Sequence, residues 1–62
     1  MTYYQKSIVE CLGCSKEEAE SIEDIMRYEI FHSTLDWQTK EQFDMAALQG
    51  LNILRERQSV LN

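Results

Sequence analysis

The chain has 62 residues, of which 11 are acidic and six are basic, so its formal net charge is −5. This length allows at most one domain, and the hydrophobic fraction of 44% is typical of a globular rather than a disordered protein. The acidic balance argues against direct binding to nucleic acid or to an anionic membrane, because both partners require a basic surface. No segment approaches the ~20 consecutive apolar residues of a membrane span.

The start of the sequence lacks the charged and apolar blocks of a signal peptide, and the chain contains two cysteines. Cysteines without an export signal favour a reducing compartment, so we expect a cytoplasmic protein. Proline is absent and glycine occurs twice, so little interrupts helix formation. The sequence therefore predicts a single all-α domain over residues 1–62.

A short helix is predicted over residues 2–12. Its apolar side chains follow the spacing of one helical face, at Tyr4, Ile8, Cys11 and Leu12. Gly13 follows this segment and is suited to a helix C-terminus, where positive φ is needed.

A second helix is predicted over residues 15–31. Ser15 and Glu18 have the spacing of a capping box, in which each side chain bonds to the other's backbone amide. The predicted apolar face consists of Ala19, Ile22, Ile25, Met26 and Ile30. On the opposite face, Glu23 and Arg27 have the spacing of an i, i+4 ion pair.

A third helix is predicted over residues 39–58, with a second capping-box pattern at Thr39 and Gln42. Its apolar face contains the small residues Ala46 and Gly50, which would allow another helix to approach closely. We expect an antiparallel hairpin between the second and third helices, with the short first helix packed against it.

Two polar contacts are expected from this hairpin. Arg57 would lie near Glu18, since the end of one helix is placed beside the start of the other. Glu29 would lie near the beginning of the third helix and accept from its free amides.

Four large apolar residues fall outside the predicted hairpin interface: Tyr28 and Phe31 on the second helix, and Met45 and Leu48 on the third. The first helix can cover only one of these sites. Because small proteins bury such surface against a second layer, we expect self-association, most simply a two-fold dimer that forms a helical bundle.

Cys11 and Cys14 form a CxxC pattern that is compatible with three roles. Tetrahedral zinc requires four ligands, so a four-thiolate site would need two chains. A redox role favours a thiol at a helix N-terminus, whereas Cys11 is predicted at a helix end, on the apolar stripe. We therefore favour buried or half-buried structural cysteines.

His32 is the only histidine, and Ser33 and Asp36 follow it. General acid–base chemistry would depend on this residue or on a perturbed carboxylate. Its position at a predicted helix end favours interaction with the last carbonyls instead, with Ser33 and Asp36 as capping residues. The sequence predicts neither an enzyme nor a bound cofactor.

Two further features have both a structural and a functional interpretation. Leu35 and Trp37, in the connector, would close one end of the core or form a partner-binding anchor. Glu17, Glu20 and Asp24 would form a solvated acidic face or a surface that imitates nucleic-acid phosphates.

The stretch Phe31–Thr39, FHSTLDWQT, together with the paired alanines Ala46 and Ala47, resembles small uncharacterised helical proteins encoded by bacteriophages. The resemblance covers about half of the chain. It implies a phage origin and a place in the host cytoplasm, where tiny phage proteins often act by binding host proteins.

The leading hypothesis is a small acidic accessory protein that acts by protein–protein interaction. The first alternative is an inhibitor of a nucleic-acid enzyme that mimics DNA or RNA. The second alternative is a DNA-binding regulator that uses Lys40, Arg55 and Arg57 of the third helix, although the net charge of −5 disfavours it.

Overall fold

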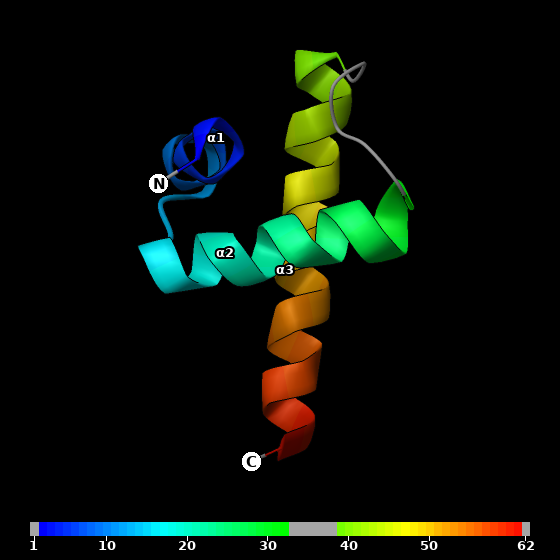
Figure 1. Cartoon of the computed structure of the whole chain (residues 1–62). Coiled ribbons are helices and arrows are strands. Elements are labelled where there is room, and N and C mark those ends of the chain that lie inside the picture. Colours follow the sequence, from blue (N-terminus) through cyan, green and yellow to red (C-terminus); the bar gives the residue numbers. More distant parts are fainter. Residues whose placement is uncertain (1, 33–38, 62) are drawn as a thin grey trace.

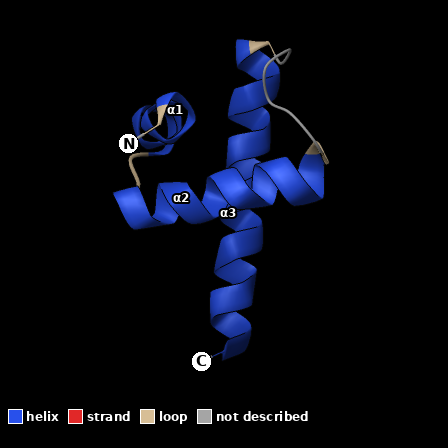
Figure 2. Ribbon diagram, viewed as in Figure 1, coloured by secondary structure: helices blue, strands red, loops and turns tan. Residues whose placement is uncertain are grey.

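The computed structural model describes residues 2–32 and 39–61, with side chains described through residue 59. These residues form helices α1 (Tyr3–Leu12), α2 (Lys16–Ile25) and α3 (Lys40–Leu61), and a π-helical turn η1 (Met26–Ile30) that continues α2. Figure 2 shows helices and loops alone in this part of the chain. The prediction of an all-helical fold with three helices is confirmed.

Local capping fixes both ends of α1. The Thr2 hydroxyl accepts from the Gln5 amide, and the Gln5 side chain accepts from the Thr2 amide. This capping box moves the start of the helix one residue beyond the predicted boundary. At the other end Gly13 has a φ of 67° and donates its amide to the Val9 carbonyl, as its predicted role requires.

The predicted capping box of α2 is confirmed, with reciprocal hydrogen bonds between Ser15 and Glu18. The helix widens at its end, where the Phe31 amide donates to the Met26 carbonyl five residues earlier. His32 follows with a φ of 66°, in the left-handed region that non-glycine residues rarely adopt. Ser33 and Asp36, which follow it, lie outside the described residues.

The second predicted capping box is also confirmed, because Thr39 and Gln42 exchange the same pair of hydrogen bonds. From there α3 continues to Leu61, beyond the predicted end at residue 58.

The continuous α2–η1 helix and α3 cross steeply rather than lying side by side along their lengths (Figure 1). The crossing lies at Gly50, where an added Cβ would be 3.1 Å from Ile22 Cγ2 and 3.6 Å from Met26 Cγ. The absence of a side chain at Gly50 therefore permits α2 and α3 to approach closely, as predicted from the small residues on the third helix. The steep crossing separates Arg57 from Glu18, so the ion pair expected between them is wrong.

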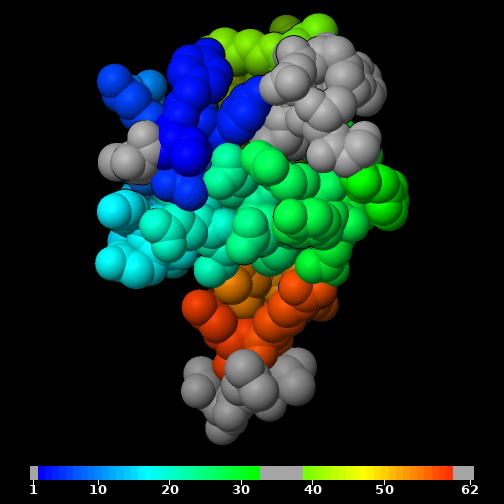
Figure 3. Space-filling model, in the orientation of Figure 1, coloured from blue at the N-terminus to red at the C-terminus, as the bar shows by residue number. Residues whose placement is uncertain are grey.

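α1 packs in the angle between α2 and the N-terminal half of α3 (Figure 1). Its fully buried Ile8 joins a core contributed by all three helices. The buried hydrophobic residues are Ile8, Ala19, Ile22, Ile25, Met26, Phe43, Ala46, Ala47 and Leu51. The last turns of α3 extend below this core, as Figure 3 shows in orange and red.

Candidate functional site

A groove whose described lining residues are uncharged lies between η1 and α3, with a volume of about 560 Å³. We call it the η1–α3 groove; its lining consists of Ile30, Phe31, Gln42, Met45, Ala46, Leu48, Gln49 and Asn52. Met45 is 74% exposed and Leu48 is 52% exposed, whereas Phe31 packs partly against the core. The structure thus brings together three of the four residues predicted for self-association.

Tyr28, the fourth of these residues, does not line the groove, although it is 67% exposed. It lies within the π-helical turn, where the additional residue per turn changes the relative direction of neighbouring side chains. Tyr28 and Phe31 therefore do not form the single apolar patch that ordinary helical spacing suggests.

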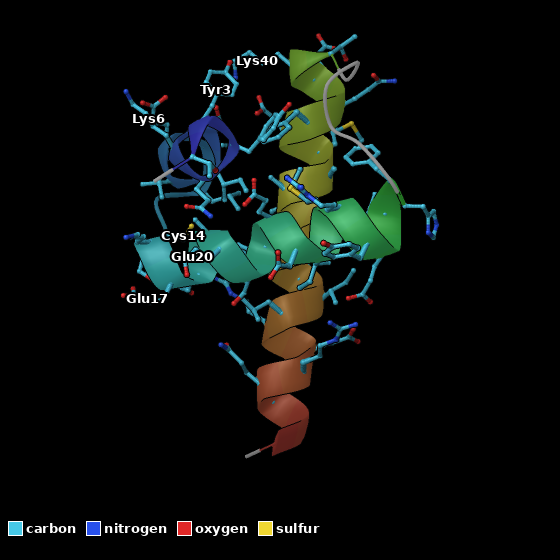
Figure 4. The ribbon with its side chains drawn as sticks, in the orientation of Figure 1. Tyr3, Lys6, Cys14, Glu17, Glu20 and Lys40 are labelled. Atoms are coloured by element: carbon cyan, nitrogen blue, oxygen red, sulfur yellow. The ribbon has the colours of Figure 1, made fainter. Side chains whose placement is uncertain are left out.

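The predicted acidic surface is present on α2. Glu17, Glu20 and Asp24 are exposed, and no ion pair within the described residues involves them. Figure 4 shows Glu17 and Glu20 at the N-terminal end of the helix. The other residues predicted to bind a partner, Leu35 and Trp37, lie outside the described residues.

Glu23 does not belong to this solvated surface, because it is only 7% exposed. Its carboxylate accepts hydrogen bonds from the Thr2 hydroxyl at 3.4 Å and from Gln5 Nε2 at 3.0 Å. The predicted pair with Arg27 is present at 3.5 Å. Glu23 therefore joins the beginning of α1 to the middle of α2, which sequence spacing alone did not indicate.

A second and larger groove, of about 780 Å³, lies between α1 and the first turns of α3. We call it the α1–α3 groove. Its α1 lining consists of Tyr3, Tyr4, Lys6, Ser7, Glu10 and Cys11, and its α3 side consists of Thr39, Lys40, Phe43 and Asp44. The sequence analysis did not identify this site, although its α1 residues recur at the i, i+4 spacing of a single helical face.

An ion pair lies at the α3 side of this groove, with Lys40 Nζ 2.8 Å from Asp44 Oδ2. The hydrogen bond from Lys40 lowers the pKa of Asp44 below its ordinary value, and the same bond raises the pKa of Lys40. Cys11 lies on the opposite side of the groove near Asp44, and Asp44 helps to raise the pKa of its thiol.

Of the two free cysteines, Cys14 agrees with the prediction of a buried or half-buried residue and Cys11 does not. Cys11 is exposed toward Asp44 rather than buried on the apolar stripe, because the rotation of α1 points Tyr4, Ile8 and Leu12 inward. Cys14 is half-buried and packs against the core. Partial burial raises the pKa of both thiols, and Asp44 raises that of Cys11 further.

Raised pKa values keep both thiols protonated near neutral pH, which disfavours a nucleophilic role. Among the residues that the structure describes, no three His, Cys, Asp or Glu side chains are grouped to hold a metal ion. His32 is exposed at the end of η1, and it lines neither groove.

The cations of α3 are largely engaged in ion pairs. Lys40 contacts Asp44, and Arg57 donates two hydrogen bonds to Glu29. This hydrogen bonding lowers the pKa of Glu29. The expectation that Glu29 accepts from the first amides of α3 is therefore wrong, because Thr39 and Gln42 cap that end. Of the three predicted DNA-binding residues, Arg55 alone is without an ion pair among the described residues.

None of the described helices combines the length and apolar character needed to cross a membrane. No protein-family model matches the chain, and comparisons with curated proteins and with solved structures find no significant match.

Proposed function

We propose that this chain is a small acidic protein that acts by protein–protein contact and that it forms a two-fold dimer through the η1–α3 groove. The observation that carries the proposal is the exposure of Met45 and Leu48 beside Phe31 in one concave surface. Burying apolar surface contributes ~25 cal/mol per Å², so covering these side chains favours association.

Charge also supports a second copy of the chain as the occupant. The described residues of the groove lining are all uncharged, although 27% of the residues in the chain are charged. Two molecules that each carry a net charge of −5 repel least where their contacting surfaces are uncharged. The amides of Gln42, Gln49 and Asn52 can exchange hydrogen bonds across a two-fold axis.

Light scattering coupled to gel filtration tests the dimer at tens of micromolar protein. Met45→Lys and Leu48→Lys should each yield the monomer mass, because both place a charge in the interface. Gln58→Lys adds the same charge at an exposed position outside the groove and should remain dimeric. A monomeric wild-type protein, or dimeric groove variants, would contradict the proposal.

We further propose a phage-encoded protein that works in the host cytoplasm, with Glu17, Glu20 and Asp24 on α2 and Leu35 and Trp37 in the connector facing a host protein. The resemblance at Phe31–Thr39 supports the phage origin. Capture from a bacterial lysate, with Trp37→Ala as the matched variant, tests the connector. Equal recovery of a specific host protein by both forms would exclude Trp37 as an anchor.

A second candidate function is imitation of nucleic acid, which the unpaired carboxylates of Glu17, Glu20 and Asp24 favour. A partner bound in this way should be released as salt rises, and the triple lysine variant should not capture it. A triple lysine variant of Glu10, Glu41 and Glu56, which are exposed and lie outside α2, controls for the change in net charge. Capture that is insensitive to salt would exclude the mimic.

A further inference from the structure

The α1–α3 groove is a concave surface that the proposed dimer leaves uncovered. Its volume of about 780 Å³ lies within the ~300–1,000 Å³ range of small-molecule sites. Small side chains from Ser7 and Cys11 contribute to the α1 side, so there is room above that helix face.

Three aromatic rings form one wall of the groove. The Tyr4 ring stacks on Phe43 with centroids 5.8 Å apart, and Tyr3 meets Tyr4 edge-on at 5.6 Å. The rings run from the core to the surface, since Phe43 is 8% exposed and Tyr3 is 78% exposed. An exposed ring beside a fixed aromatic pair offers a stacking surface for one more ring.

The charged groups of the groove divide into a closed pair and an open pair. Lys40 and Asp44 neutralise each other at 2.8 Å. Lys6 and Glu10 have no ion-pair partner among the described residues, and they lie one helical turn apart on α1. Figure 4 shows the side chains of Tyr3 and Lys40 extending toward each other from α1 and α3, while Lys6 extends from the outer side of α1.

One unpaired cation and one unpaired anion at adjacent turns match a ligand that carries both charges. A ligand with only a negative charge would be repelled by Glu10, and one with only a positive charge by Lys6. The Cβ atoms of residues at i and i+4 are about 6 Å apart, which places the two side chains within reach of neighbouring groups on one small molecule.

From this arrangement we propose that the α1–α3 groove binds a zwitterionic aromatic compound, either an aromatic amino acid or an aromatic dipeptide. The aromatic ring of the ligand stacks beside Tyr3 and Tyr4. Its carboxylate contacts the Lys6 ammonium, and its ammonium contacts the Glu10 carboxylate. This inference is independent of the dimer, which the mass measurement tests separately.

Titration of isotope-labelled protein with phenylalanine, followed by amide NMR shifts, tests the site. Saturable shifts are expected at Ser7, Cys11 and Phe43, without matching shifts at Met45 and Leu48.

Phenylalanine amide lacks the carboxylate and N-acetylphenylalanine lacks the ammonium. Each should bind about two- to fivefold more weakly, the size of an exposed ion pair. Alanine, without a ring, should not saturate the site. Phenylalanylglycine, in which a peptide bond separates the ammonium from the carboxylate, distinguishes a dipeptide from the free amino acid.

Matched variants assign each contact. Lys6→Gln should remove the preference for phenylalanine over its amide, and Glu10→Gln the preference over N-acetylphenylalanine. Tyr3→Ala should weaken all aromatic ligands, whereas Tyr28→Ala, at an exposed tyrosine outside the groove, should leave them unchanged. Absence of saturable shifts with phenylalanine would overturn the proposal. So would equal binding of phenylalanine, phenylalanine amide, N-acetylphenylalanine and alanine by the wild-type protein. If Tyr3→Ala unfolds, the variants at Lys6 and Glu10 still test the proposal, because both positions are exposed and their substitution should not disturb the fold.

Discussion

Arg57 and Glu29, 28 positions apart in the chain, are joined by two hydrogen bonds from one guanidinium to one carboxylate. This two-point contact connects the C-terminal half of α3 to the end of η1, on the far side of the crossing from α1. It therefore adds a second contact between the two long elements, in addition to the packing at Gly50.

The Glu29–Arg57 pair should make stability depend on acid pH. Because Arg57 lowers the folded-state pKa of Glu29 below its ordinary value of 4.5, the pair stabilises fully above that value. Its contribution is lost as pH falls through the folded-state pKa. Urea unfolding measures the free energy of unfolding of wild type and of Glu29→Gln. The difference between these two free energies should be largest near neutral pH and smaller in acid. Glu41→Gln, at an exposed carboxyl without an ion pair, is the control; an unchanging difference for Glu29→Gln would contradict the assignment.

The buried carboxylate of Glu23 should contribute more to stability than its exposed neighbours do. Glu23→Ala leaves Thr2 and Gln5 without their acceptor and should lower the free energy of unfolding by about 1–3 kcal/mol. Glu20→Ala removes a carboxylate from the exposed face of α2 and should change the free energy of unfolding by less than about 0.5 kcal/mol. Thermal unfolding followed by circular dichroism measures both. Similar effects for the two variants would mean that the network does not stabilise α1.

Substitutions at Gly50 test the close approach of α2 and α3 at their crossing. Gly50→Ala gains about 1 kcal/mol of helix propensity, but its Cβ would lie 3.1 Å from Ile22 Cγ2, so the two effects should nearly cancel. Gly50→Leu cannot fit and should destabilise by about 2 kcal/mol or more. Gln58→Leu, at an exposed position of the same helix outside both grooves, controls for adding a large apolar side chain. A stable Gly50→Leu variant with unchanged helix contacts would refute the close crossing.

The contact between Asp44 and Cys11 should be visible in thiol reactivity. Partial burial and Asp44 hold the pKa of Cys11 above its ordinary value of 9.0, so alkylation should be slow at neutral pH and accelerate as pH rises. Asp44→Asn removes the negative charge, lowers the pKa of Cys11 and should speed its alkylation. Cys14, whose pKa Asp44 does not affect, is the internal control. Mass spectrometry measures the alkylation rate of each cysteine. An equal rate for Cys11 in wild type and in Asp44→Asn would disprove the contact.

The sequence predicted the features that depend on neighbouring residues. Capping at Ser15 and Thr39 requires only side chains three positions apart, and Gly13 needs only its own backbone freedom. The small residue at position 50 also predicted a close helix approach, because a missing Cβ limits the distance between two backbones.

The features that the sequence did not predict depend on how whole helices are placed. Periodicity shows which face of a helix is apolar, but not the angle at which a partner crosses it, so Arg57 was paired with the wrong glutamate. The rotation of α1 determines that Cys11 faces Asp44 and that Glu23 is covered. The π-helical turn alters the spacing that seemed to join Tyr28 and Phe31.

The steep crossing also makes the two ends of the molecule unequal as attachment points. Residues 55–59 of α3 are exposed beyond the core, so an affinity tag or surface tether placed after α3 leaves both grooves accessible. Thr2, by contrast, bonds to Gln5 and to the buried Glu23. A bulky fusion ahead of it would compete with the contacts that hold α1, so immobilisation through the C-terminal end of α3 is the better design for binding measurements.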